Sequence, residues 1–377
     1  LGNACFWQGR YAESQTYFEK ALAIHKEVGD TRGELSALNN LGQVMQLLGK
    51  PTKATQFFSQ ALAASRKIGD QLAEGVLLTN QGGLLLLLGN FEQAQTDLAL
   101  AVKIRQQIAN EEGAAMALKL LGDVSRQQGQ YAQANAYYEQ ALEIAVRLQL
   151  PRQRGESLAG LAALYRDLGA YARAEKYLEQ ALAALPEDET ASRLRAFSLG
   201  CSLNYLSGNP TQAQALGELA VAQSEDFSAI LAEALTNLGQ VLAQVGQTGT
   251  ARQHFMRALE IRQELGQMHL TAESRAGLAQ AALAQDDLDA ALSQAAAIWQ
   301  LCESNPLWGV ERPLWVYLTC YRVFQCVGDP RARNVLSAAK TRLRERAANI
   351  ESDELRATYL EDVPENREID QLYRDLQ

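Results

Sequence analysis

The sequence predicts an all-α protein, a right-handed α-solenoid of about nine helix-turn-helix repeats that closes with a helical cap at its C-terminus. Three observations predict this fold. A pattern of small and apolar residues returns about every forty residues, glycine recurs at one place in successive units, and alanine is plentiful while aromatic residues make up only 7%. A fixed period of this size indicates structural repeats, each of which packs on its neighbours.

The repeat is clearest over residues 41–62, LGQVMQLLGKPTKATQFFSQAL. We expect two helices in each unit: helix A carries the Leu-Gly pair, and helix B carries the alanines and the aromatic residue. Glycine favours the left-handed cap at which helix A stops. The residues at that position are Gly49, Gly89, Gly129 and Gly169.

Small residues at fixed positions predict how the two helices of a unit meet. Ala54, Phe58 and Ala61 form one apolar stripe along helix B at helical spacing. Gly42, in helix A, costs about 1 kcal/mol relative to alanine in an exposed helix. Because glycine recurs there at Gly2, Gly82, Gly122 and Gly239, we expect helices A and B to approach closely at this point.

These landmarks resemble the tetratricopeptide repeat, although the units here have 38–40 residues instead of about 34. Long units of this kind resemble the C-terminal sensor region of bacterial STAND-type signal-transduction ATPases and transcriptional regulators. The charged C-terminal segment ELRATYLEDVPENREIDQLYRDL resembles the closing segment of those regulators. The expected division is a solenoid of eight repeats over 1–300 (the first truncated), a degenerate ninth over 301–350 and capping helices over 351–377.

Composition narrows the classes of partner. The chain of 377 residues has 35 basic and 44 acidic side chains, and a net charge of −9 argues against a nucleic-acid partner. No apolar run approaches the roughly 20 residues that cross a bilayer. The five cysteines show no CxxC spacing, so we expect reduced, buried thiols and a cytoplasmic protein. The chain starts in mid-repeat, and we expect it to be part of a longer protein.

No motif in the sequence carries catalytic chemistry. P-loop, GxGxxG and HExxH patterns are absent, and the three histidines lie in different repeats without metal-ligand spacing. We therefore expect no catalytic residue, no metal ligand and no cofactor. The basic run of Lys340, Arg342, Arg344 and Arg346 alternates faces of one helix. We expect it to be a solvated surface, with nucleic-acid contact as the weaker alternative.

The resemblance implies that the concave wall is formed by helix A, at positions one before the Leu and two and six after it. Asparagine is a poor helix former, and the resemblance implies that an Asn before the Leu bonds the backbone of a bound peptide. The alternative is that these amides are exposed or bond a neighbouring helix. Lys and Arg are nearly missing from these positions, so a carboxylate clamp is not expected. The candidate partner-binding residues are Trp7, Asn40, Gln43, Leu47, Asn80, Leu87, Asp123, Gln127, Asn237 and Gln240.

These observations favour a non-catalytic binding module. The leading hypothesis is the sensor or interaction region of a larger bacterial signalling protein, which binds a protein, a peptide or a small inducer in the concave groove. The resemblance implies an upstream ATPase domain that such binding would switch. The alternative is a constitutive scaffold that holds a partner helix or peptide without switching. An enzyme is disfavoured, because no acid-base or nucleophile constellation is visible.

Overall fold

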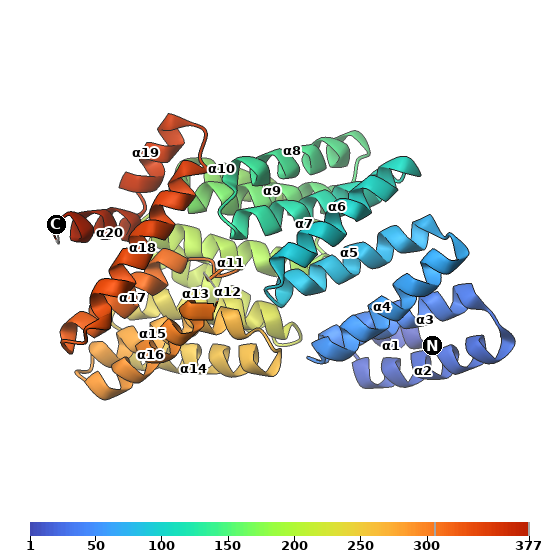
Figure 1. The fold of residues 1–377 in the computed structure, drawn as a ribbon, viewed down its shortest axis with the longest axis horizontal. Coiled ribbons are helices and arrows are strands. Elements are labelled where there is room, and N and C mark those ends of the chain that lie inside the picture. The colour runs from blue at the N-terminus through green and yellow to red at the C-terminus, as the bar shows by residue number, and fades with distance from the viewer. Residues whose placement is uncertain (305–306, 376–377) are drawn as a thin grey trace.

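The computed structural model describes residues 1–304 and 307–375, except for the side chains of Trp7 and Ser304. The described residues form helices and no strand, so the predicted all-α solenoid is confirmed. Within these residues nine helix pairs follow one another, and two further helices come after them (Figure 1). The pairs are α1 (Gly2–Trp7) and α2 (Tyr11–Val28), α3 (Thr31–Leu47) and α4 (Pro51–Ile68), α5 (Gln71–Leu87) and α6 (Phe91–Gln107), α7 (Glu111–Gln127) and α8 (Tyr131–Arg147), α9 (Pro151–Asp167) and α10 (Tyr171–Ala184), α11 (Thr190–Leu206) and α12 (Pro210–Gln223), α13 (Ser228–Gln244) and α14 (Thr248–Glu264), α15 (Thr271–Leu283) and α16 (Leu288–Ser304), and α17 (Pro313–Cys326) and α18 (Arg331–Ala348); a 3-10 helix, η1 (Met268–Leu270), precedes α15, and α19 (Asp353–Glu361) and α20 (Pro364–Asp375) form the cap.

Local sequence signals set the helix boundaries. α4 ends at Gly69, which has a φ of 69°, in the left-handed conformation that glycine adopts without strain. The next helix begins at once, because the carboxylate of Asp70 accepts a hydrogen bond of 3.0 Å from the backbone N–H of Ala73. The same two features, a left-handed Gly29 and an Asp30 that caps the next helix, separate α2 from α3.

The predicted close approach of helices A and B is confirmed. A Cβ atom added at Gly122 would lie 2.5 Å from the ring of Tyr138, and one added at Gly42 would lie 2.5 Å from the ring of Phe58. The Tyr138 ring also faces Gly160 of the following A helix, at a distance of 2.4 Å from an added Cβ. Each of these aromatic rings on a B helix therefore packs directly on the backbone of an A helix, where glycine has no side chain to keep it away.

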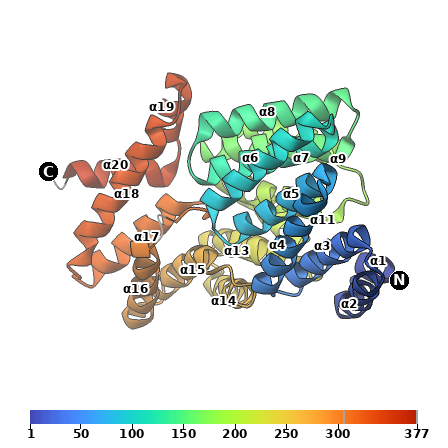
Figure 2. The same cartoon turned by 45° about the vertical axis from the view of Figure 1, so that its right-hand side comes forward.

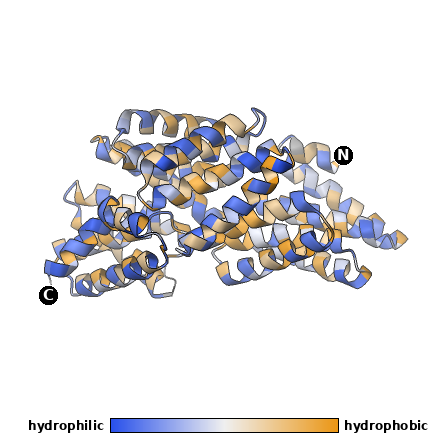
Figure 3. Cartoon of the chain, turned by 90° about the horizontal axis from the view of Figure 1, so that it is seen from above, coloured by the Kyte–Doolittle hydropathy of each residue, from blue (hydrophilic) through white to orange (hydrophobic). Residues whose placement is uncertain are grey.

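The A helices line the inside of the superhelix. Each A helix contacts the next A helix, from α3 on α5 to α15 on α17, whereas each B helix packs on the A helices beside it. The two termini lie at opposite ends of the molecule in Figures 1 and 2. In Figure 3 apolar and polar segments alternate along the helices, as expected for helices that bury one face.

The superhelix closes on itself along a seam between its two halves. The turns that join helices A and B in the second to fifth pairs touch segments 180 residues or more further along the chain. A Cβ atom at Gly49 would lie 3.3 Å from the carbonyl oxygen of Glu264, and one at Gly169 would lie 3.1 Å from that of Thr358. Between these points, Gly89 meets His269 and Gly129 meets Arg346. The largest apolar core accordingly joins residues 131–203 to residues 272–369.

The basic run of α18 differs from the prediction of a solvated surface. Arg346 and Lys340 are both buried. Arg346 donates a hydrogen bond of 2.9 Å to the phenol oxygen of Tyr131, and Lys340 forms an ion pair with Asp370 of α20. The prediction for these two residues was wrong, because the seam and the cap cover a helix face that the sequence pattern left exposed. Within the described chain, no helix has the length and apolar character needed to cross a bilayer.

Candidate binding site inside the superhelix

The predicted wall residues of α3 are partly or largely accessible. The amide side chains of Asn40 and Gln43 are half-buried. Neither side chain forms a hydrogen bond with another described residue. Leu47, one turn further on, exposes 44% of its surface. Leu87, on α5, is half-buried. Trp7 ends α1, and its side chain lies outside the described residues.

The other two asparagines bond a neighbouring A helix. The amide of Asn80 donates a hydrogen bond of 2.8 Å to the side-chain oxygen of Asn39 on α3. The amide of Asn237 donates one of 3.0 Å to the hydroxyl of Ser198 on α11. Their recurrence at one repeat position thus has a structural role, which is the alternative that the sequence left open.

Asp123 and Gln240 are engaged through their side chains by other residues of the chain, and Gln127 is engaged through its backbone carbonyl. The carboxylate of Asp123 accepts hydrogen bonds from the Tyr138 hydroxyl at 2.8 Å and from Lys119 Nζ at 2.7 Å. The backbone carbonyl of Gln127 accepts a hydrogen bond of 3.1 Å from Arg346. The side-chain oxygen of Gln240, which is buried, accepts one of 2.9 Å from Arg312.

A non-helical segment of the chain lies inside the superhelix. Residues 307–312, which lead into α17 and are called the connecting segment below, bury Leu307 and Val310 almost completely. The Trp308 ring packs edge-on against Phe91 of α6, with ring centroids 6.0 Å apart. Through Glu311 and Arg312 the segment reaches α7, α9, α13 and α15. It therefore occupies the middle of the inner face, where the A helices converge.

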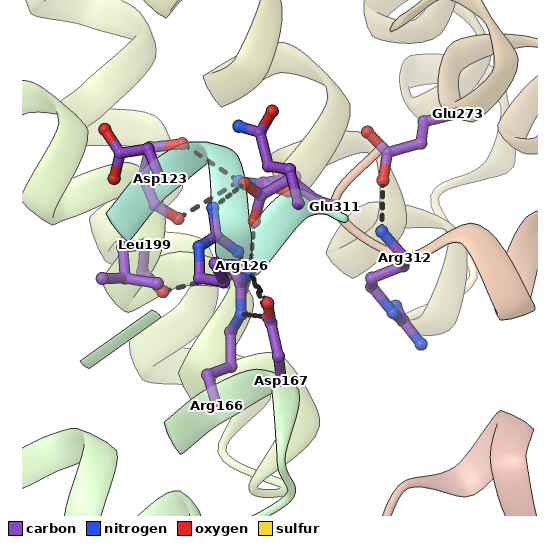
Figure 4. Close-up of polar contacts among 12 residues, drawn as sticks. Asp123, Arg126, Arg166, Asp167, Leu199, Glu273, Glu311 and Arg312 are labelled. Atoms are coloured by element: carbon purple, nitrogen blue, oxygen red, sulfur yellow. Dashed lines mark hydrogen bonds and ion pairs between the residues drawn. The ribbon is translucent and has the colours of Figure 1, made fainter. Parts of the chain in front are cut away.

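Glu311 joins two buried arginines on successive A helices (Figure 4). Its carboxylate lies 3.0 Å from the guanidinium of Arg126 on α7 and pairs with that of Arg166 on α9. Asp167 completes the cluster, at 2.6 Å from each arginine. The hydroxyl of Ser202 accepts a further hydrogen bond of 2.8 Å from Arg166. Hydrogen-bonded guanidinium groups of this kind suit carboxylate groups.

Arg312, the next residue, fixes the end of the connecting segment that leads into α17. Its guanidinium forms two hydrogen bonds of 3.0 Å with the carboxylate of Glu365 on α20. It also lies 5.4 Å from the ring centroids of both Tyr205 and Trp315, within cation–π range. The backbone N–H of Arg312 donates a hydrogen bond of 2.9 Å to Glu273.

The charges of the interior act on one another strongly. Burial alone would raise the pKa of Glu311, but Arg166 and Arg126 outweigh it and hold the pKa of that carboxyl well below its usual range. Burial, followed by the charge of Glu311, raises the pKa of Glu273 to about 7. The same two causes raise the pKa of Glu233. Arg166 and Arg126 thus favour the charged form of Glu311, whereas burial and the charge of Glu311 favour the neutral forms of Glu273 and Glu233.

The sequence interpretation missed the arginines and the connecting segment. A signal for the arginines existed, since Arg126 and Arg166 occupy the same repeat position exactly forty residues apart and each precedes a wall position. No comparable signal marked the connecting segment, which lies where the repeat pattern is lost.

The chain is similar to known repeat proteins. The tetratricopeptide repeat profile matches residues 1–67, 74–147, 192–264 and 230–297, and a second profile of the same description matches 157–191. No curated protein matches the chain. A crystal structure of a Rap protein complexed with competence and sporulation factor is similar over 93% of this chain and 97% of its own, with a TM-score of 0.67 and 17% identity. The apo form of RapI is similar over 70% of this chain and 96% of its own, with a TM-score of 0.58 and 14% identity.

Proposed function

This chain belongs to the tetratricopeptide repeat family, and from that premise we propose that it is a non-catalytic module that binds an extended peptide or protein segment on the inner face of α3 and α5. One observation carries the proposal. Asn40 and Gln43 have no side-chain hydrogen bond within the described chain, whereas the wall residues Asp123 and Gln240 are engaged internally. Unpaired amides beside an apolar residue suit a peptide backbone, which offers both donors and acceptors.

The similarity to a Rap protein supports a peptide or protein ligand, because that structure contains a bound factor and shares the fold over most of both chains. The proposal extends to a sensor role in a larger bacterial signalling protein of the STAND type, located in the cytoplasm, in keeping with five free cysteines. Such a role requires that the ligand bind one conformation of the superhelix better than another. The seam provides a contact that could differ between two conformations.

The test is a selection of peptides from a random display library on the whole chain, followed by affinity measurements on two double variants. Asn40→Ala with Gln43→Ala removes the amides of α3. Gln56→Ala with Gln60→Ala removes two exposed amides from α4, the outer helix of the same repeat, and serves as the matched control. We expect the first variant to lose about tenfold or more in affinity and the control to be unchanged. Equal affinity of both variants would contradict the proposed site.

The sensor and scaffold alternatives are separated by the shape of the chain with and without a selected peptide. A sensor changes its radius of gyration or the hydrogen exchange of seam residues when the peptide binds. A scaffold binds with neither change.

A further inference from the structure

We propose that the Arg126–Arg166 pair is a binding site for a carboxylate of an extended acidic peptide, and that Glu311 of the connecting segment occupies this site as an internal substitute. The inference rests on the proposed function, because it extends the same inner face towards its middle and specifies the chemistry of the ligand.

The pair has the properties of a built anion site. Arg126 and Arg166 expose only 7% and 3% of their surfaces, yet they lie on adjacent helices with their charges directed at one carboxylate. Asp167 balances only one of the two positive charges. Among the described residues, Arg126 Nε has no hydrogen-bond partner although it is buried. Burying a cation without a counter-charge costs folding free energy, so the two arginines require a second carboxylate.

That second carboxylate is supplied by a segment that behaves like a bound peptide. The connecting segment is not helical, and it lies outside both of the helix pairs that it joins. Like a bound peptide, it buries apolar side chains, at Leu307 and Val310, and presents charged groups to the A helices, at Glu311 and Arg312. Its sequence therefore indicates what the inner face recognises, namely an acidic residue directly after a branched apolar one.

The site can be filled from outside only if the connecting segment leaves it. The cavity that remains next to Arg166, lined also by Glu311, Arg312 and Tyr359 among others, measures about 40 Å³, which is room for a few water molecules and no more. An external ligand must thus compete with a segment of the same chain, whose local concentration is on the order of millimolar. Removing the Glu311 carboxylate weakens the hold of the connecting segment on the site and leaves Arg126 and Arg166 free to pair with the carboxylate of an added peptide.

The test uses two labelled peptides of the segment sequence, LWGVER and its Gln version LWGVQR, on the whole chain. Glu311→Ala exposes the site, and Glu311→Gln is the second variant, which keeps the side-chain shape if the alanine variant does not fold. Glu303→Ala removes an exposed acidic side chain from α16 and is the matched control. Circular dichroism and urea unfolding verify that each variant is folded.

We expect the Glu311 variants to bind LWGVER at least about tenfold more tightly than the wild type or the Glu303→Ala control does, and to prefer it to LWGVQR by a similar factor. Equal binding of the two peptides, or no binding by a folded Glu311 variant, would overturn the carboxylate site. Such a result would leave the proposed function intact if library peptides still depended on Asn40 and Gln43. Loss of that dependence, with the Glu preference retained, would instead overturn only the α3 site.

Discussion

The guanidinium of Arg346 lies 2.9 Å from the phenol oxygen of Tyr131, although 215 residues separate them. A second guanidinium nitrogen of Arg346 reaches the carbonyl oxygen of Gln127 at 3.1 Å. This one side chain thus ties the ninth helix pair to the fourth across the seam. A solenoid ordinarily has contacts only between neighbouring repeats, so contacts of this kind convert an open array into a closed body.

Arg346→Ala should destabilise the protein by about 2–4 kcal/mol, because it leaves the buried Tyr131 hydroxyl and Gln127 carbonyl without this donor. The measurement is the urea midpoint, together with the radius of gyration in solution. Arg333→Ala, at an exposed position of the same helix, is the control and should change neither. A variant as stable and as compact as the wild type would show that the seam does not depend on this arginine.

The aromatic ring of Tyr138 leaves no room for a side chain at Gly122 of α7. In Gly122→Ala the added methyl group would lie 2.5 Å from the ring, and such overpacking costs about 1–3 kcal/mol. Gly249→Ala adds the same methyl group to α14, where no atom lies within 4 Å, and should be neutral or slightly stabilising because alanine favours helix. Thermal unfolding of both variants checks the prediction, which fails if the two shift the midpoint alike.

The repeat pattern predicted the fold because the residues that carry it act locally. Gly42 and Phe58 meet within one unit, and the spacing between them is visible in the sequence. The family resemblance named candidate wall residues on the A helices, but it gave no way to tell that Asn80 and Asn237 bond neighbouring helices. Whether an amide is free or bonded depends on a partner in another repeat.

The centre of the interior was not predictable in the same way. Glu311 lies 185 residues from Arg126, in a stretch without repeat landmarks. Its position depends on how far the superhelix turns, since only a closed turn brings the connecting segment between α7 and α15. That curvature is the sum of small rotations between many repeats, and a single sequence does not specify it residue by residue.

The turn at Gly169 tests the seam at the cap. Gly169 and Gly208 both have a positive φ, of 78° and 84°, so alanine is strained at either site, by about 1 kcal/mol. Only at Gly169 would the methyl group also meet the cap, 3.1 Å from the Thr358 carbonyl oxygen and from Val363. We expect Gly169→Ala to be the more destabilising and to accelerate amide exchange in α19 and α20, while Gly208→Ala leaves that exchange unchanged. If amide exchange in α19 and α20 were the same in both variants, the contact at Gly169 would not be what holds the cap.

Glu273 should make stability depend on pH near neutrality. Burial and the charge of Glu311 raise its pKa from 4.5 to about 7, so the folded protein holds a proton that the unfolded chain has already released. The stabilisation from this proton is fully present below about pH 4.5 and is lost as pH rises through 7, by up to a few kcal/mol at about 1.4 kcal/mol per pKa unit.

Glu273→Gln removes the titrating group while its amide oxygen can still accept the hydrogen bond from the Arg312 backbone. We therefore expect the free energy of unfolding, measured in urea at pH 5 and pH 8, to fall less with rising pH in this variant than in the wild type. Glu260→Gln, at an exposed position of α14, should retain the wild-type dependence. If Glu273→Gln and Glu260→Gln lose stability equally between the two pH values, the carboxyl of Glu273 is ionised throughout that range and the interior charges are balanced without its proton.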